Sequence, residues 1–140
     1  MTEDLRLCFE PDNEPAKLFV TNGVDNFNIA VTGQPAYYPV SYFLKTNDGE
    51  ILGGLLGMIW GGWLHIKIVW VAEPVRKKGQ ARRLIAAAEE YARRRGCHGS
   101  YLETFSFQAR PMYEKLGYRL FGEIADCPPG HTQYFLSKRL

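Results

Sequence analysis

The stretch that decides the fold is "VWVAEPVRKKGQARRLIAAAEEYARRRG", which spans Val69–Gly96. A run of β-branched and aromatic residues ends at Glu73-Pro74, and a basic turn that contains Gly79 follows. After the turn, apolar residues recur at helical spacing, and charged residues are expected on the opposite face. The apolar set is Ala81, Leu84, Ile85, Ala88 and Ala92, and the charged set is Arg82, Arg83, Glu89, Glu90, Arg93 and Arg94. The stretch therefore predicts a strand, a basic turn and a long amphipathic helix in direct succession.

The segments before this stretch predict an antiparallel meander. Tight turns are expected at Asp48-Gly49 and Gly61-Gly62, because Asp-Gly and Gly-Gly pairs favour hairpins. The strands that they join are "SYFLKT" (Ser41–Thr46), "ILGGLLGMIW" (Ile51–Trp60) and "WLHIKIVWV" (Trp63–Val71). Further upstream, "LRLCFE" is expected to form a first strand, and Glu14–Gly33 one or two short helices interrupted at Asn22-Gly23.

The segments after the long helix complete a mixed α/β sheet. We expect a strand over Ser100–Phe107 and a short helix that begins near Pro111 and stops at Gly117. Two closing strands, "YRLFGEI" and "TQYFLSKRL", follow as a hairpin. The order is then meander, helix, strand, short helix and hairpin, in which the long helix makes a crossover between neighbouring strands.

The bulk composition indicates one soluble domain over residues 1–140 and excludes several classes of protein. A formal net charge of +2 argues for no particular partner, and the N-terminus lacks the apolar run of a signal peptide. Cys8, Cys97 and Cys127 show no CxxC spacing, which favours reduced thiols in the cytoplasm over a disulfide framework or a zinc site. The uncharged run Ile51–Leu64 is shorter than the roughly 20 residues of a membrane span, and its glycines favour a hairpin.

The basic turn has the chemistry of a phosphate site. The first N–H groups of a helix have no partner within the helix and carry partial positive charge. Gly79 lets a ligand approach the main chain, and Arg76, Lys77 and Lys78 add charge, which together suits a phosphate or a pyrophosphate. Neither the GxxxxGK[ST] loop of nucleoside triphosphatases nor the dinucleotide fingerprint GxGxxG is present.

Two motifs of the chain resemble those of one enzyme superfamily. The pattern Arg-x-x-Gly-x-Ala over Arg76–Ala81, preceded by "VWV" (Val69–Val71), is similar to the acyl-CoA pyrophosphate loop of the GNAT superfamily of N-acetyltransferases. "SFQARPMYEKLGY" (Ser106–Tyr118) resembles the element N-x-x-A-x-x-x-Y-x-x-x-G-F of the same family. Ser106 replaces the asparagine, and Ala81 replaces the second glycine of the loop. The resemblance covers roughly Tyr42–Leu140.

This resemblance implies a GNAT-like fold with acetyl-CoA as co-substrate and no metal. The sheet is expected to be splayed where the pantetheine arm lies against the main chain of Val69, Trp70 and Val71. Tyr113 matches the tyrosine that protonates the departing thiolate, and a core aromatic is the alternative role for it. The remaining cofactor contacts implied by the family are Arg76, Lys77, Lys78, Gly79, Gln80, Ala81 and Ser106.

The residue that removes a proton from the acceptor amine is left open by the sequence. Glu73 at the strand end is a candidate base, and a solvated turn carboxylate is an equal reading. Glu103 and His131 are candidate acceptor-binding residues, with a solvent-facing carboxylate and a turn residue as the respective alternatives. His65 is expected to pack, and a water chain could also remove the proton.

The function implied is transfer of an acetyl group from acetyl-CoA to a primary amine of a small molecule, by direct attack through a tetrahedral intermediate. The alternatives are a catalytically degenerate module that binds or senses CoA, and acetylation of a protein amine. A nucleic-acid surface is disfavoured, since Glu89-Glu90 interrupts the basic residues. Family members are frequently dimers, and the sequence does not fix a homodimer.

Overall fold

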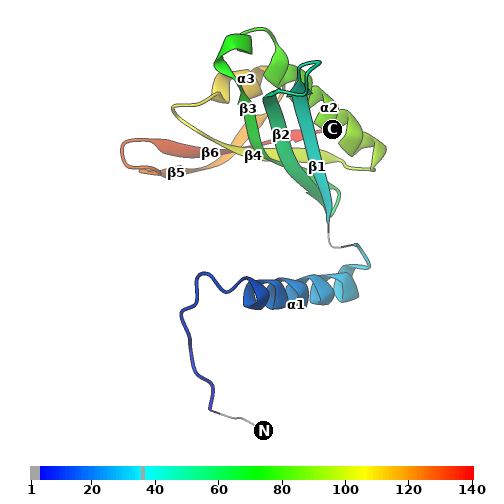
Figure 1. Ribbon diagram of the computed structural model, residues 1–140, viewed down its shortest axis with the longest axis vertical. Coiled ribbons are helices and arrows are strands. Elements are labelled where there is room, and N and C mark those ends of the chain that lie inside the picture. The colour runs from blue at the N-terminus through cyan, green and yellow to red at the C-terminus, as the bar shows by residue number, and fades with distance from the viewer. Residues whose placement is uncertain (1–3, 36) are drawn as a thin grey trace. The chain divides into compact units, whose positions relative to one another are not determined.

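The computed structural model describes residues 4–35 and 37–140 (Figure 1). The chain divides into two compact units, residues 1–36 and residues 37–140, and each is described by itself. The expectation of one domain over residues 1–140 stays a prediction. Among the described residues, no helix combines the length and the hydropathy needed to cross a bilayer.

The N-terminal unit contains one long helix, α1 (Glu14–Thr32). The Asn13 side chain accepts a hydrogen bond from the Ala16 amide at 3.0 Å, and Gly33 ends the helix with φ of 69°. The predicted interruption at Asn22-Gly23 is wrong, because one internal glycine costs only about 1 kcal/mol in a helix of this length. The predicted strand "LRLCFE" is also wrong: residues 5–10 join no sheet, and the side chains of Leu5, Leu7 and Phe9 are exposed.

Residues 37–140 form a six-stranded mixed sheet with two α-helices and one short 3-10 turn, which confirms the predicted fold class. The strand order is β1-β2-β3-β4-β6-β5, and only the pair β3–β4 is parallel. The strands are β1 (Tyr38–Lys45), β2 (Ile51–Trp60), β3 (Trp63–Val71), β4 (Gly99–Phe105), β5 (Arg119–Ala125) and β6 (Thr132–Arg139). The helices are the short 3-10 turn η1 (Glu73–Val75), α2 (Gln80–Arg94) and α3 (Arg110–Lys115). Helix α2 is thus the crossover between the two parallel strands.

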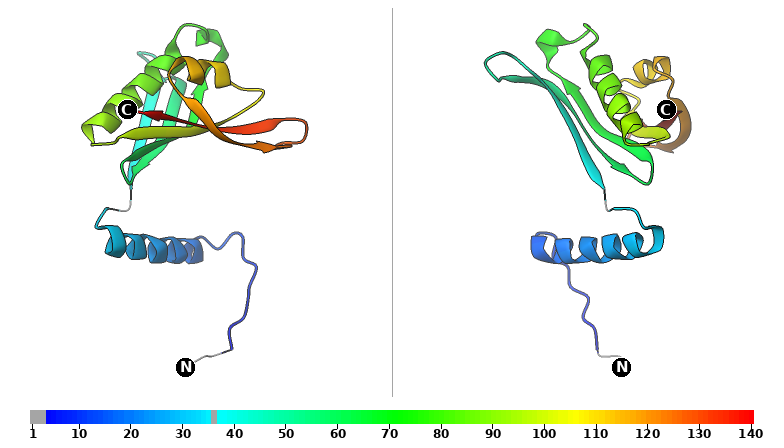
Figure 2. Two further views of the ribbon diagram at one scale, coloured as in Figure 1. Left: turned by 180° about the vertical axis from the view of Figure 1, so that it is seen from behind. Right: turned by 90° about the vertical axis from the view of Figure 1, so that its right-hand side faces the viewer.

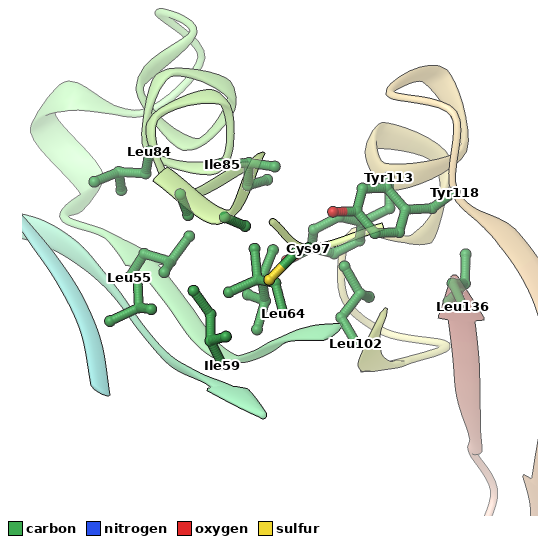
Figure 3. Close-up of a cluster of buried hydrophobic side chains, with 14 residues drawn as sticks. Leu55, Ile59, Leu64, Leu84, Ile85, Cys97, Leu102, Tyr113, Tyr118 and Leu136 are labelled. Atoms are coloured by element: carbon green, nitrogen blue, oxygen red, sulfur yellow. The ribbon is translucent and has the colours of Figure 1, made fainter. Parts of the chain in front are cut away.

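Both α-helices of this unit pack on the same face of the sheet (Figures 2 and 3). Leu84 and Ile85 of α2 lie in one buried cluster with Leu55, Leu64 and Leu102 of the central strands. The α2 face also carries the small residues Ala88 and Ala92, both fully buried, which let the helix lie close to the strands. The apolar face predicted from the sequence therefore packs α2 on the sheet, and the N-terminus of α2 follows the end of β3 through the basic turn.

One charged residue of α2 lies on the buried face and not on the polar face as expected. Glu89 is only 6% exposed. Its carboxylate accepts hydrogen bonds from Lys138 Nζ at 3.0 Å and from the Tyr118 hydroxyl at 2.9 Å, and Tyr118 is also bonded to Ser100. Burial, reinforced by the charge of Glu89, raises the pKa of Tyr118, so its hydroxyl remains a donor. The network joins α2 to β4 and β6.

We predict that Glu89→Ala lowers the free energy of unfolding by about 3 kcal/mol, because it leaves Lys138 without its partner and Tyr118 without its acceptor. Urea unfolding followed by circular dichroism measures the loss. Glu90→Ala on the exposed face is the control, and we expect a change within about 0.5 kcal/mol. Equal stabilities of the two variants would contradict the structural role of Glu89.

Candidate active site

The strands β3 and β4 pair with each other along only the first half of their length and then separate. Their parallel pairing runs from Trp63 opposite Gly99 to Ile66 opposite Leu102, and stops there although β3 continues to Val71. At the same point the β2–β3 register shifts, so that one extra β3 residue forms a bulge. Residues 67–71 of β3 consequently present main-chain groups that β4 does not pair.

Gly57 makes the bulge sterically possible. This residue of β2 lies where the register shifts, and a Cβ there would overlap the carbonyl oxygen of His65. The bulge also changes which β3 side chains face the helices: Leu64 and Ile66 do so before it, and Val69 and Val71 after it. The edge next to the gap is therefore fixed by close backbone packing.

A cleft of about 390 Å³ lies between the separated parts of β3 and β4. Its walls come from residues 66–69 of β3 and residues 102–105 of β4. Gln108, Ala109, Tyr113 and Gln133 complete the lining. Such a slot, walled by an unpaired strand edge, can accept an extended ligand arm that hydrogen-bonds to the main chain as an added strand would.

A second hollow of about 310 Å³ lies at the N-terminus of α2. Gly79 caps the helix with φ of 78°, and Lys77 has φ of 62°, a left-handed conformation that is uncommon for a residue with a side chain. The first main-chain bond of the helix runs from Arg83 N–H to Gly79 O, and no side chain of the described residues caps the helix. The amides of residues 80–82 are thus available to an anion.

Arg76 of the loop and Gln80 at the start of α2 add two features to this hollow. Arg76 Nε donates to Val71 O at 2.7 Å and so ties the loop to the end of β3. The side-chain oxygen of Gln80 is buried and has no hydrogen-bond partner within the described residues. An unsatisfied buried oxygen costs free energy unless a ligand supplies a donor. Within the described part of the chain, Gln80 therefore carries an unsatisfied acceptor beside the free amides at the start of α2.

Helix α3 connects the two hollows. Met112 lines the hollow at α2, and its neighbour Tyr113 lines the cleft. Tyr113 is 8% exposed and packs edge-on against Tyr118 at 6.1 Å. Burial raises the pKa of Tyr113, which keeps its hydroxyl protonated and able to donate.

On the other side of the cleft, Glu103 of β4 contacts His65 of β3. His65 Nε2 lies 2.8 and 3.0 Å from the two carboxylate oxygens. Glu103 and Lys67 are the two charged residues that line the cleft. The cleft thus places a buried hydroxyl and a carboxylate on either side of one slot.

The sequence pattern described as "Acetyltransferase (GNAT) family" matches residues 2–118. The chain belongs to the GNAT family of acetyltransferases. A blasticidin-S acetyltransferase of Streptomyces morookaense is 47% identical over 93 residues, which are 66% of this chain and 68% of that protein.

Solved structures of GNAT and related acetyltransferases share the fold. The crystal structure of an acetyltransferase from Bacillus cereus ATCC 14579 is 34% identical, with a TM-score of 0.83 over 96% of this chain and 98% of that chain. A streptothricin-type acetyltransferase from Bacillus anthracis strain Ames, solved in complex with acetyl coenzyme A, has a TM-score of 0.64 at 22% identity. It covers 74% of this chain and 63% of that chain, and at this identity it shows the fold alone.

The structure brings most of the residues expected from the GNAT motifs to the two hollows. Tyr113, Val69 and Glu103 line the cleft. The hollow at α2 contains Val71, Arg76, Lys77, Gly79, Gln80 and Ala81. Their roles toward a ligand stay predictions.

Five expected residues lie outside both linings, namely Trp70, Glu73, Lys78, Ser106 and His131. Trp70 is 52% exposed, and Glu73 is exposed on η1. Lys78 is exposed in the basic turn before Gly79. The Ser106 hydroxyl accepts a hydrogen bond from the Thr132 amide at 3.0 Å, so it joins the end of β4 to the start of β6.

His131 and His65 belong to groups of packed rings. His131 packs edge-on against Phe107 at 4.8 Å, and His65 stacks on Tyr101 at 4.3 Å. The expected packing of His65 is therefore observed, but its contact with Glu103 was not anticipated. Sequence reasoning also missed Gln108 and Gln133, because the turn after β4 and the pairing of β4 with β6 bring them to the cleft.

We predict that Tyr113 keeps its proton above pH 10, about the pKa of a free tyrosine side chain. Ring-selective ¹³C NMR across pH 8–12 measures this, with the urea-unfolded chain as reference. Since the folded pKa is raised, the stability that the buried phenol contributes is complete below pH 10 or so and declines as the pH rises through the folded value. A titration midpoint of Tyr113 in the folded protein that lies at or below its midpoint in the unfolded chain would contradict the burial argument.

Proposed function

We propose that this GNAT protein transfers an acetyl group from acetyl-CoA to a primary amine of a small molecule. The observation that carries the proposal is the junction of two hollows: a slot along the unpaired edge of β3 and an uncapped helix N-terminus, joined by Met112 and Tyr113. The blasticidin-S acetyltransferase at 47% identity supports a small-molecule acceptor. The three cysteines are free thiols, which is compatible with a place in the cytoplasm.

In this proposal the hollow at α2 holds the diphosphate of acetyl-CoA. The amides of residues 80–82, the helix dipole and the cations of the turn all favour negative charge. Gly79 leaves open space where a side chain would project, so the ligand can approach the backbone. Gln80, whose buried oxygen lacks a donor, fits an amide-bearing arm. The arm then follows residues 69–71 of β3 toward the cleft.

Tyr113 acts as the proton donor to the departing thiolate. A free thiol has a pKa of about 8.5, so a thiolate leaves more readily when a donor stands beside it. The raised pKa of Tyr113 keeps its hydroxyl neutral and protonated at neutral pH. Glu103 holds the acceptor amine, since it lines the cleft and Glu73 does not. His131, next to Phe107, borders the acceptor side.

We predict that Gly79→Glu abolishes acetyl-CoA binding, because the new carboxylate occupies the place of the diphosphate. Titration calorimetry with acetyl-CoA measures the affinity, which we expect to be micromolar for the unmodified protein. The matched control is Gly49→Glu, since Gly49 also has a positive φ of 88° and open space around it. Binding that is unchanged in Gly79→Glu, or lost equally in Gly49→Glu, would contradict this location.

We predict that Tyr113→Phe lowers kcat by about 10²- to 10⁴-fold while the affinity for acetyl-CoA stays the same. Release of free thiol from acetyl-CoA, followed over a library of amines, measures the rate. Tyr91→Phe on α2 is the control. Tight binding with no turnover on any amine, in the wild type as well as the variant, would instead indicate a module that senses CoA.

A further inference from the structure

Glu103 occupies a special place on β4. It is the first residue after the last β3–β4 pair, so its side chain stands where the two strands separate. Both carboxylate oxygens contact His65 Nε2, and the side chains of His65 and Glu103 are 19% and 26% exposed. The carboxylate is therefore partly shielded but still reached from the cleft, which raises the strength of its interaction with a cation.

His65 is itself held in one orientation. Its ring stacks on Tyr101 at 4.3 Å with an interplanar angle of 10°, and Tyr101 packs edge-on against Trp63 at 6.2 Å. Burial, followed by the negative charge of Glu103, raises the pKa of Tyr101. The stack favours this position of the imidazole, in which Nε2 contacts both carboxylate oxygens of Glu103.

Aromatic residues are the neighbours of Glu103 on its face of the sheet. Tyr101 and Phe105 flank it on the same face of β4, and Phe135 lies opposite it on β6. Phe105 stacks on Phe107 at 5.4 Å, and Phe107 is 56% exposed. An array of rings thus leads from the carboxylate to an exposed flat surface at the end of the strand.

The end of this array is tied in place by hydrogen bonds. The amide of Ser106 donates to Thr132 O at 2.9 Å, and the amide of Thr132 donates to the Ser106 hydroxyl. Gln108 accepts hydrogen bonds from the Phe105 amide and the Thr104 hydroxyl, which closes the turn after β4. Phe107 therefore projects from a turn that is anchored at both ends.

We propose that Glu103, positioned by His65, binds the ammonium group of the acceptor, and that the acceptor is a cationic amine whose scaffold carries a flat unsaturated ring. The ring lies against Phe105 and Phe107, where stacking is favourable, and the ammonium gains both the carboxylate and the surrounding π-faces. This inference rests on the proposed acetyl transfer and names its substrate class. The ammonium gives its proton to solvent before attack, so Glu103 acts in binding and not as the base.

The test compares two amines of equal carbon skeleton, 2-phenylethylamine and 2-cyclohexylethylamine, with acetyl-CoA as donor. We expect the wild type to favour the aromatic amine by about 5-fold in kcat/KM. Glu103→Gln should raise KM for both amines by about 10- to 100-fold and change kcat little, since it removes a charge that binds ground state and transition state alike. Phe107→Leu should remove the preference for the flat ring.

His65→Phe tests the positioning role, because it keeps a ring on Tyr101 and removes the nitrogen that holds Glu103. It should raise KM by about 5-fold alone and add nothing in the Glu103→Gln background. Glu123→Gln on the exposed surface of β5 is the control, with KM unchanged. Calorimetry should show that acetyl-CoA binds all variants equally.

The outcomes separate this inference from the proposed function. Acetylation of both amines with no preference, and with the same KM in Glu103→Gln, would overturn the inference while acetyl transfer stands. A wild type that binds acetyl-CoA but acetylates neither amine would overturn the inference alone if other amines react. Absence of both acetyl-CoA binding and turnover would overturn the two together.

Discussion

The geometry of the candidate active site depends on one backbone constraint, the β2–β3 bulge at the point where β3 and β4 separate. Where Gly57 faces His65, β3 gains an extra residue relative to β2, and its pairing with β4 ends after Ile66. If β3 and β4 paired regularly beyond this point, the main-chain groups of β3 would all be hydrogen-bonded within the sheet and no slot would remain. The bulge instead leaves them free, at a modest cost in lost ladder hydrogen bonds that a ligand can restore.

The second requirement is that α2 and α3 stay fixed relative to the parted strands. The apolar face of α2 packs on β1–β3, while Glu89 reaches Tyr118 and Lys138 near the strands that carry the other wall. Arg76 ties the loop before α2 to the end of β3 through the Val71 carbonyl. These contacts hold the uncapped helix end in line with the slot, so that one extended ligand can occupy both hollows.

Much of this arrangement could be predicted from the sequence, because local signals determine it. The bounds of β2 and β3 follow from their apolar runs and the Gly61-Gly62 turn, and α2 follows from its 3.6-residue period. The failures have tertiary causes. Glu89 looks like a surface residue in the pattern, yet partners on distant strands make its burial favourable. The break expected at Asn22-Gly23 gave too much weight to one glycine, which α1 accommodates without interruption.

The candidate site was predictable only in part for the same reason. The basic turn and Tyr113 carry motifs that can be recognised along the chain, whereas the contact between His65 and Glu103 joins residues 38 apart. It depends on the parallel register of β3 and β4, which no local pattern shows. The motif position of Ser106 predicts a ligand contact, but its hydroxyl accepts a hydrogen bond from the Thr132 amide.

Amide hydrogen exchange measured with and without acetyl-CoA tests the central claim most directly, because the claim concerns main-chain N–H groups. The account predicts that added acetyl-CoA slows exchange in two separate segments, residues 67–71 of β3 and residues 79–82 at the start of α2. Slower exchange in neither segment, despite binding, would show that the parted strand and the helix end are not the ligand site.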